Sequence, residues 1–170
     1  FRVLQSIDGF PAITSDAWIN GRLIANHACS DLWARGAQVV SAQASITLPA
    51  VSSGIQQEIL KQTLLGIKSI LDLQGASLIG GHTFEARSEA QNPYSFGLEV
   101  SLSINGRVDS LKVPWGKDGL QIDDILLLSR PIGTGSLFAA AMQGVVDPRH
   151  VDSAIEQMSS GHYQWFKDLI

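Results

Sequence analysis

The sequence predicts an α+β fold, in which a mixed or antiparallel sheet carries two long helices on one face. Two stretches, residues 15–35 and 53–75, have apolar residues at helical spacing. Four short apolar or alternating runs are typical of strands: residues 3–7, 39–48, 78–79 and 94–104. In chain order these elements follow the pattern β-α-β-α-β-β.

The composition suits one globular domain and excludes several classes of function. The chain of 170 residues is 45% hydrophobic and 16% charged, so it can bury a core and still leave apolar surface for a partner. Its net charge is −4 without clustered Lys or Arg, which excludes a nucleic-acid-binding role. A nucleotide remains possible, because backbone N–H groups and a metal ion can supply positive charge.

The cellular setting follows from what the sequence lacks. It has no apolar run of the roughly 18 residues that a membrane span needs, and no signal-peptide pattern. The single cysteine, Cys29, excludes an internal disulfide, and we place it inside the first helix as a small core residue. We therefore expect a cytoplasmic protein that binds neither a membrane nor nucleic acid.

The first strand, residues 3–7, is expected to stop at Asp8-Gly9, a dipeptide typical of turns. A carboxylate at the end of a strand makes Asp8 a candidate ligand-binding residue, since such loops commonly carry ligands. An ordinary Asp-Gly turn would give the same pattern.

The first helix, residues 15–35 with Gly36 as its stop, carries the second candidate. Asp31 lies on the same helix face as Ile24 and Ala28, within about 60° at 100° per residue. A carboxylate among apolar neighbours is costly without a partner, so this face either lines a cleft or meets a cation. The alternative is a carboxylate at a partly solvated boundary.

The second helix has the clearest signals of all the elements. Ser53 and Gln56 predict a capping box at its start, and Gly75 predicts its end. The strand before it, residues 39–48, is rich in β-branched residues and is closed by Pro49.

Paired glycines follow the second helix in Gly80-Gly81-His82-Thr83, directly after the apolar pair Leu78-Ile79. Glycines at a strand end allow a ligand to approach the backbone closely, and His82 and Thr83 add polar groups. A β-bulge would produce the same sequence. The next strand, residues 94–104, is expected to end in a turn at Asn105-Gly106.

The last part of the chain predicts one more strand and two helical stretches. Residues 124–129 form a short apolar run bounded by charge and proline, which indicates a strand. Gly133-Thr134-Gly135 then leads into a helix over residues 136–142, where it forms either an anion site at the helix N-terminus or a flexible exit. The tail, residues 151–170, is amphipathic and is expected to be helical.

In their order and spacing, these pieces resemble selenophosphate synthetase, a member of the PurM-like superfamily. The resemblance is carried by residues 6–10 (SIDGF), 25–37 (ANHACSDLWARGA), 78–83 (LIGGHT) and 130–135 (RPIGTG). The Ser-Asp helix motif is common to the superfamily, whereas Gly-Gly-His-Thr is similar to the selenium branch and other branches resemble Gly-Gly-Glu-Thr or Gly-Gly-Asp-Thr.

The resemblance implies ATP-dependent phosphorylation of selenide to selenophosphate, with ATP and Mg²⁺ as cofactors. By this resemblance Asp31 would ligate the Mg²⁺ that bridges the ATP phosphates, and Asp8 would contact the nucleotide or its metal. Four more residues would contact ATP across the interface of a homodimer: Gly80, Gly81, His82 and Thr83. The implied fold is the PurM-like N-terminal domain, whose sheets pair into a dimer barrel.

Departures from the family pattern limit what this stretch of sequence implies. The family's catalytic Cys or selenocysteine and Lys would precede Phe1, so we assign no catalytic residue here, and Gly9 stands where the family often has an aromatic residue. We expect residues 1–150 to be the ATP-binding domain and residues 151–170 to begin the connection to a missing C-terminal domain. Because the chain starts without Met, we expect a piece of a longer protein that does not make selenophosphate unaided.

Two alternatives stay open beside this reading. One is another PurM-like ATP-dependent kinase or synthetase with a different acceptor. The other is a non-catalytic dimerisation or sensor domain that has kept the fold and lost the chemistry.

Overall fold

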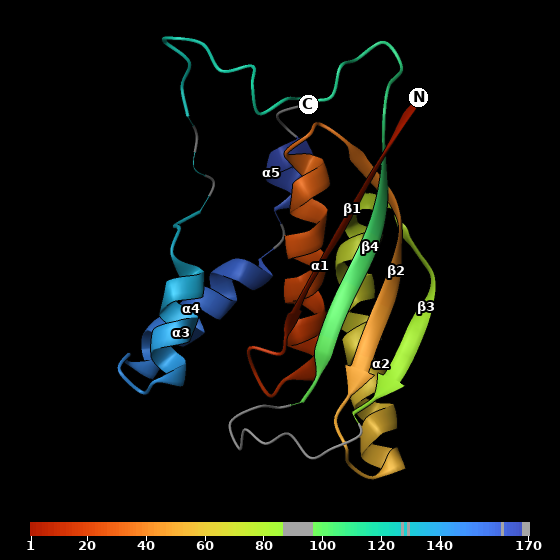
Figure 1. Cartoon of the computed structure of the whole chain (residues 1–170), viewed down its shortest axis with the longest axis vertical. Coiled ribbons are helices and arrows are strands. Elements are labelled where there is room, and N and C mark those ends of the chain that lie inside the picture. The colour runs from red at the N-terminus through yellow and green to blue at the C-terminus, as the bar shows by residue number, and fades with distance from the viewer. Residues whose placement is uncertain (87–96, 127, 129, 161, 168–170) are drawn as a thin grey trace.

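Four strands form one sheet in the computed structural model, which describes residues 1–86, 97–126, 128, 130–160 and 162–167 (Figure 1). The strands are β1 (Arg2–Pro11), β2 (Gln38–Leu48), β3 (Ser77–Glu85) and β4 (Glu99–Val108). Two long helices, α1 (Ala17–Trp33) and α2 (Ser53–Leu71), cover one face of this sheet.

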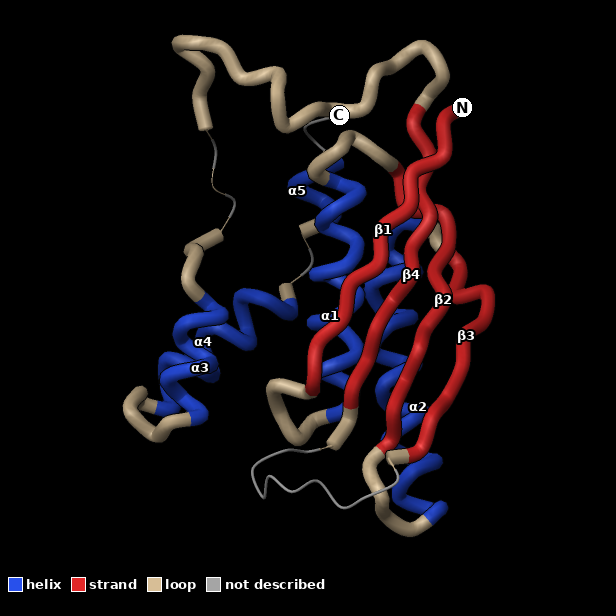
Figure 2. The backbone as a smooth tube through the Cα atoms, viewed as in Figure 1, coloured by secondary structure: helices blue, strands red, loops and turns tan. Residues whose placement is uncertain are grey.

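The sheet is mixed, with the strand order β1-β4-β2-β3 (Figure 2). β4 pairs antiparallel with both β1 and β2, whereas β2 and β3 are parallel. The strands β1 and β3 are therefore the two edges of the sheet, and both lack a second neighbour among the described residues. This arrangement confirms the predicted α+β fold with two helices on one face.

The core lies between the sheet and the two helices. Its fully buried apolar side chains come from both layers: Leu23, Ile24, Val39, Ile46, Ile67, Ile70, Leu71, Leu98, Leu102 and Ile104. The helices approach closely at Gly21 and Gly66, because a Cβ at Gly21 would overlap the carbonyl oxygen of Thr63, and one at Gly66 that of Trp18. Cys29 is buried in this core as predicted, and burial raises the pKa of its thiol to about 12.

Two predicted turns are wrong, because both glycine dipeptides lie inside strands. β1 continues through Asp8 and Gly9 to Pro11, and Gly9 lies opposite Ser101, whose side chain fills the space that a Cβ would need. β4 likewise continues through Gly106, where a Cβ would come within 2.8 Å of Leu32 Cδ1 on α1. These glycines admit a neighbouring side chain rather than reverse the chain. The sequence predicts that the strand before Asn105-Gly106 starts at residue 94. In the structure this strand, β4, begins at Glu99, and residues 94–96 lie outside the described residues.

The second helix has the predicted length but a different start. Ser52 is its N-cap without a side-chain hydrogen bond, and Gln56 Nε2 donates to the Pro49 carbonyl (2.9 Å), so the capping box predicted at Ser53 does not form. At the other end, a 3₁₀ turn (Asp72–Gln74) follows α2, and Gly75 ends it with a φ of 68°, as predicted.

Beyond Val108 the chain leaves the sheet. The predicted strand at residues 124–129 is wrong for its described residues: Ile125 and Leu126 are 84% and 77% exposed and pair with no strand. An apolar run alone does not make a strand, because its backbone groups need a partner strand. Leu127 and Ser129 lie outside the described residues.

Three further helices follow: α3 (Thr134–Met142), α4 (Pro148–Ser159) and α5 (Tyr163–Lys167). They confirm the predicted helical character of residues 136–142 and, in its described part, of the tail. Phe166 of α5 stacks on Trp33 of α1 with ring centroids 6.2 Å apart. None of the helices in the described residues is long and apolar enough to cross a membrane.

Candidate functional site

The two predicted carboxylates lie together where α1 crosses the edge strand β1. Ser6 and Asp8 alternate onto the helix-covered face of β1, and His27 and Asp31 are one turn apart on α1. Ser6 Oγ donates to Asp31 Oδ2 (2.7 Å), and His27 Nε2 lies 2.8 Å from Asp8 Oδ2. We call these four residues the β1–α1 cluster.

The carboxylates of the cluster remain accessible from solvent. Asp31 is exposed although its helix neighbours Ile24 and Ala28 are fully buried. It therefore lies at the edge of the buried helix face, which is the alternative position that the sequence pattern allows for it. In the described part of the chain, Asp31 accepts only the Ser6 hydroxyl. Asp8 is more fully engaged, because its Oδ1 also accepts the Gly9 N–H (2.8 Å).

The donor set of the cluster fits a hard cation whose shell is completed by a ligand. Carboxylate and hydroxyl oxygens suit Mg²⁺, which takes one or two protein carboxylates and fills the rest of its octahedron with phosphates and water. Among the described residues, no group of three or more His, Cys, Asp or Glu is placed to hold a metal by itself. The oxygen donors of the cluster are therefore suited to a metal that also takes ligands from phosphate groups and water.

The Gly-Gly-His-Thr segment lies at the other edge of the sheet. Gly80 to Thr83 are inside β3 and not in a loop, and two strands separate them from β1, about 14 Å at a strand spacing of about 4.8 Å. His82 and Phe84 project from the face that the helices leave open, with ring centroids 4.5 Å apart. One chain thus brings Asp8 and Asp31 together but does not bring these residues to them.

The two glycines of this segment have different surroundings. The β2–β3 pairing shifts register between Ala42 and Gln43, and a Cβ on Gly81 would overlap the carbonyl oxygen of Ala44. A Cβ on Gly80 would meet nothing within 4 Å. Gly81 is therefore required by the irregular pairing of β3, whereas Gly80 leaves its backbone open to a ligand.

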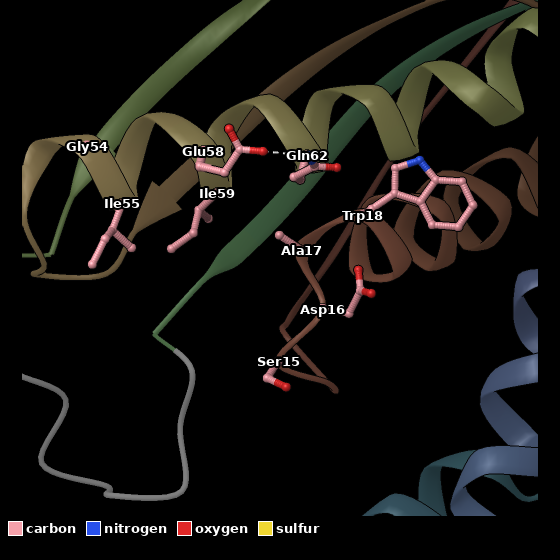
Figure 3. Close-up of a pocket in the computed structure, with 9 residues that line it drawn as sticks. All are labelled: Ser15, Asp16, Ala17, Trp18, Gly54, Ile55, Glu58, Ile59 and Gln62. Carbon is pink, nitrogen blue, oxygen red and sulfur yellow. Dashed lines mark hydrogen bonds between the residues drawn. The ribbon is translucent and has the colours of Figure 1, made fainter.

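Sequence reasoning missed a hollow of about 800 Å³ between the N-terminal ends of α1 and α2 (Figure 3). It contains none of the predicted site residues, and it is lined by Ser15, Asp16, Ala17, Trp18, Gly54, Ile55, Glu58, Ile59 and Gln62. Its carboxylates already have partners: Asp16 caps the Ile19 N–H (2.9 Å), and Glu58 accepts from Gln62 (2.6 Å). The carboxylates of the hollow are therefore already engaged in local helix contacts.

The hydrogen bond from Ser6 leads to a first prediction. Ser6→Ala in the full-length protein should weaken Mg²⁺-dependent ATP binding about tenfold, because the Asp31 carboxylate loses the hydroxyl that orients it. Ser6→Thr keeps a hydroxyl and should bind ATP nearly normally. Calorimetric titration measures both variants, and equal affinity of Ser6→Ala and the unaltered protein would contradict the prediction.

Comparison with known proteins agrees with the sequence-based resemblance. Residues 2–108 match the family described as AIR synthase related protein, N-terminal domain. A selenide, water dikinase from Aeromonas salmonicida is 31% identical over 156 residues, which cover 92% of this chain and 42% of that protein. The chain spans less than half the length of the curated relatives that it matches.

Solved structures share the fold at low sequence identity. The crystal structure of E. coli HypE, a hydrogenase maturation protein, matches with a TM-score of 0.62 and 20% identity, over 86% of this chain and 44% of that one. A structure of HypE in complex with ATP matches with a TM-score of 0.51 and 14% identity, over 64% of this chain and 31% of that one. These matches confirm the predicted PurM-like fold.

Proposed function

This chain is an N-terminal domain of the AIR synthase related family, and from this premise we propose that it is the ATP-binding domain of a selenophosphate synthetase. The enzyme would phosphorylate selenide at the expense of ATP, with Mg²⁺ as the metal. The proposal depends above all on the β1–α1 cluster, in which contacts between β1 and α1 hold two accessible carboxylates, Asp8 and Asp31. Relatives named selenide, water dikinase support the choice of acceptor.

The cluster would act by binding and orienting the nucleotide. When bound, Mg²⁺ would neutralise charge on the ATP phosphates, and phosphoryl transfer depends mainly on such neutralisation and on positioning. Asp31 would supply the direct metal ligand, because its carboxylate is exposed and has one partner in the described chain. Asp8 would contact the nucleotide or its metal, while His27 and Ser6 hold the two carboxylates in place.

The Gly-Gly-His-Thr segment would act on the ATP bound by a second copy of the chain. Gly80, His82 and Thr83 lie on the edge opposite the cluster, so a site that includes both edges needs two chains. Exposed apolar side chains on the uncovered face of the sheet support pairing of two such faces into a barrel. They are Val3, Ile7 and Phe84, with exposed fractions of 63%, 74% and 49%.

This pairing leads to a prediction about assembly. Light scattering should give a homodimer of this chain, because association of two copies would cover the sheet face that the described helices leave open. A mass near 18.3 kDa at high micromolar concentration would contradict the prediction.

We assign residues 1–150 to the ATP-binding domain and residues 151–170 to the start of a connection to a C-terminal domain. Exposed apolar side chains beyond Val108 support a further domain, because a partner surface would remove them from water. They include Leu111, Ile122, Ile125 and Ile132. The catalytic Cys or selenocysteine and Lys would lie outside this chain, so that the fragment alone would be inactive. A cytoplasmic site of action suits its single buried cysteine.

Phosphorus NMR of the full-length protein with ATP, Mg²⁺ and selenide tests the proposed reaction. We expect the resonance of selenophosphate to grow as ATP disappears, and to be absent without selenide. Consumption of ATP with a different phosphorylated product would favour another PurM-like kinase or synthetase. Absence of both ATP binding and ATP consumption would favour a non-catalytic dimerisation or sensor domain.

A further inference from the structure

A second pocket lies beside the β1–α1 cluster, between α1 and the segment that leads into α3. It has a volume of about 280 Å³, and its polar lining is Asn26, His27, Ser30, Arg130 and Thr134. His27 separates the pocket from the cluster, because the same side chain contacts Asp8. The proposed ATP site leaves the other four residues without a role.

Arg130 is a cation in this pocket that has no anionic partner among the described residues. Its side chain is partly buried, and burial lowers its pKa. In the described part of the chain, the guanidinium makes neither an ion pair nor a hydrogen bond, whereas Arg149 on α4 pairs with Asp147 at 2.6 Å. A charge withdrawn from water without a counterion is unfavourable, so the position of Arg130 indicates an anionic ligand.

Asn26 adds an acceptor for which the described part of the chain supplies no donor. The residue is only 2% exposed, and its Nδ2 is directed to the end of α4, where it lies 3.1 Å from the Met158 carbonyl and 3.3 Å from that of Ser160. This contact fixes the orientation of the amide. Oδ1 is left buried with no hydrogen-bond partner among the described residues. A buried acceptor without a hydrogen bond raises the free energy of the folded chain, so its position indicates a ligand that also carries a proton donor.

The N-terminus of α3 supplies further donors. The helix begins at Thr134 after Gly133, whose φ of 101° suits glycine and whose lack of a side chain leaves the helix uncapped. The first turn carries no acidic residue. The free N–H groups of this turn are therefore available to an anion.

We propose that this pocket binds a phosphate group that retains a proton. Arg130 and the N–H groups at the start of α3 would face the charged oxygens, and Asn26 Oδ1 would accept the P–OH. The inference is separate from the proposed function, because it uses neither Mg²⁺ nor Asp31. The phosphate can be free orthophosphate or the phosphate end of a nucleotide, and both share this chemistry.

Calorimetric titration of inorganic phosphate into the chain at neutral pH, without Mg²⁺, tests the proposal. We expect saturable binding, with sulfate at least about tenfold weaker, because sulfate has no proton to donate to Asn26 Oδ1. Arg130→Gln should weaken phosphate binding by at least about tenfold. Arg149→Gln removes an equal charge from an exposed, paired position and should bind phosphate normally.

The comparison of phosphate with sulfate uses the unaltered chain, so it does not depend on whether a variant folds. Absence of saturable phosphate binding, equal affinity for the two anions, or unchanged affinity in a folded Arg130→Gln chain would each overturn the proposal. A parallel titration with AMP identifies the source. If AMP binds more tightly than orthophosphate and this binding is lost in Arg130→Gln, the pocket is a site for a nucleotide phosphate. If orthophosphate binds more tightly than AMP, the pocket is a site for free phosphate.

Discussion

Asp31→Asn should lower the affinity of the full-length protein for ATP–Mg²⁺ by at least about a hundredfold. The substitution keeps the side-chain volume but removes an anionic ligand. Loss of a residue that merely hydrogen-bonds to a metal ligand already lowers metal affinity or activity by about 10–100-fold. Because Asp31 is exposed and accepts one hydroxyl, the free energy of unfolding should change by no more than about 0.5 kcal/mol. ATP turnover across a Mg²⁺ titration, together with a melting curve, measures both effects.

Asp72→Asn is a matched control for this experiment. Asp72 is also exposed and follows the end of α2, where it pairs with Lys68 at 2.6 Å, away from the β1–α1 cluster. Its substitution removes the same charge and should leave ATP turnover unchanged. If Asp31→Asn turns over ATP as fast as this control at every Mg²⁺ concentration, Asp31 is not a metal ligand.

Gly81→Val should destabilise the domain by about 3 kcal/mol or more. A Cβ at this position overlaps the backbone of Ala44 in β2, and the φ of 155° is one that a β-branched residue rarely adopts. Gly80→Ala is the comparison, because its Cβ would meet nothing within 4 Å while its φ of 154° also lies where residues with a Cβ are rarely found. Chemical denaturation gives the free energy of unfolding of each variant. The loss in Gly80→Ala reports the backbone strain, and the additional loss in Gly81→Val reports mainly the overlap with Ala44.

The same pair of variants tests the role of the glycines in binding. We expect the folded fraction of Gly81→Val to bind ATP normally, and Gly80→Ala to lose affinity because its methyl group stands where the ligand approaches the backbone. This expectation reverses the simplest reading of the sequence, in which Gly81 contacts the nucleotide. A Gly81→Val protein of normal stability that no longer binds ATP would restore that reading.

Local sequence patterns were sufficient to predict the two long helices and the strand β2. The repeat of apolar residues placed both long helices and the strand at residues 39–48 within about two residues, when the 3₁₀ turn after α2 is counted with that helix. These signals depend on each element's own burial. Asp8-Gly9 and Asn105-Gly106 were misread as turns. Each glycine is explained by a residue far away in the sequence, Ser101 for Gly9 and Leu32 for Gly106, and such contacts leave no local pattern.

The candidate site was predictable only in part for the same reason. Asp8 and Asp31 were found through their motifs, but their partners Ser6 and His27 become apparent only when α1 is packed on β1. The position of Gly80 on the far edge follows from the strand order, which no spacing in the sequence specifies. The hollow between the starts of α1 and α2 also depends on the packing of two helices.

The position of the bound metal–nucleotide complex tests the central claim most directly. With Mn²⁺ in place of Mg²⁺, paramagnetic broadening in NMR spectra of the full-length protein with ATP reports which amides lie near the metal. We predict that the signals of residues 6–9 and 27–31 broaden, and that those of residues 15–18 and 54–62, which include the residues that line the hollow of Figure 3, do not. Broadening centred on the hollow, with residues 6–9 and 27–31 unaffected, would contradict the assignment of the β1–α1 cluster as the ATP–metal site.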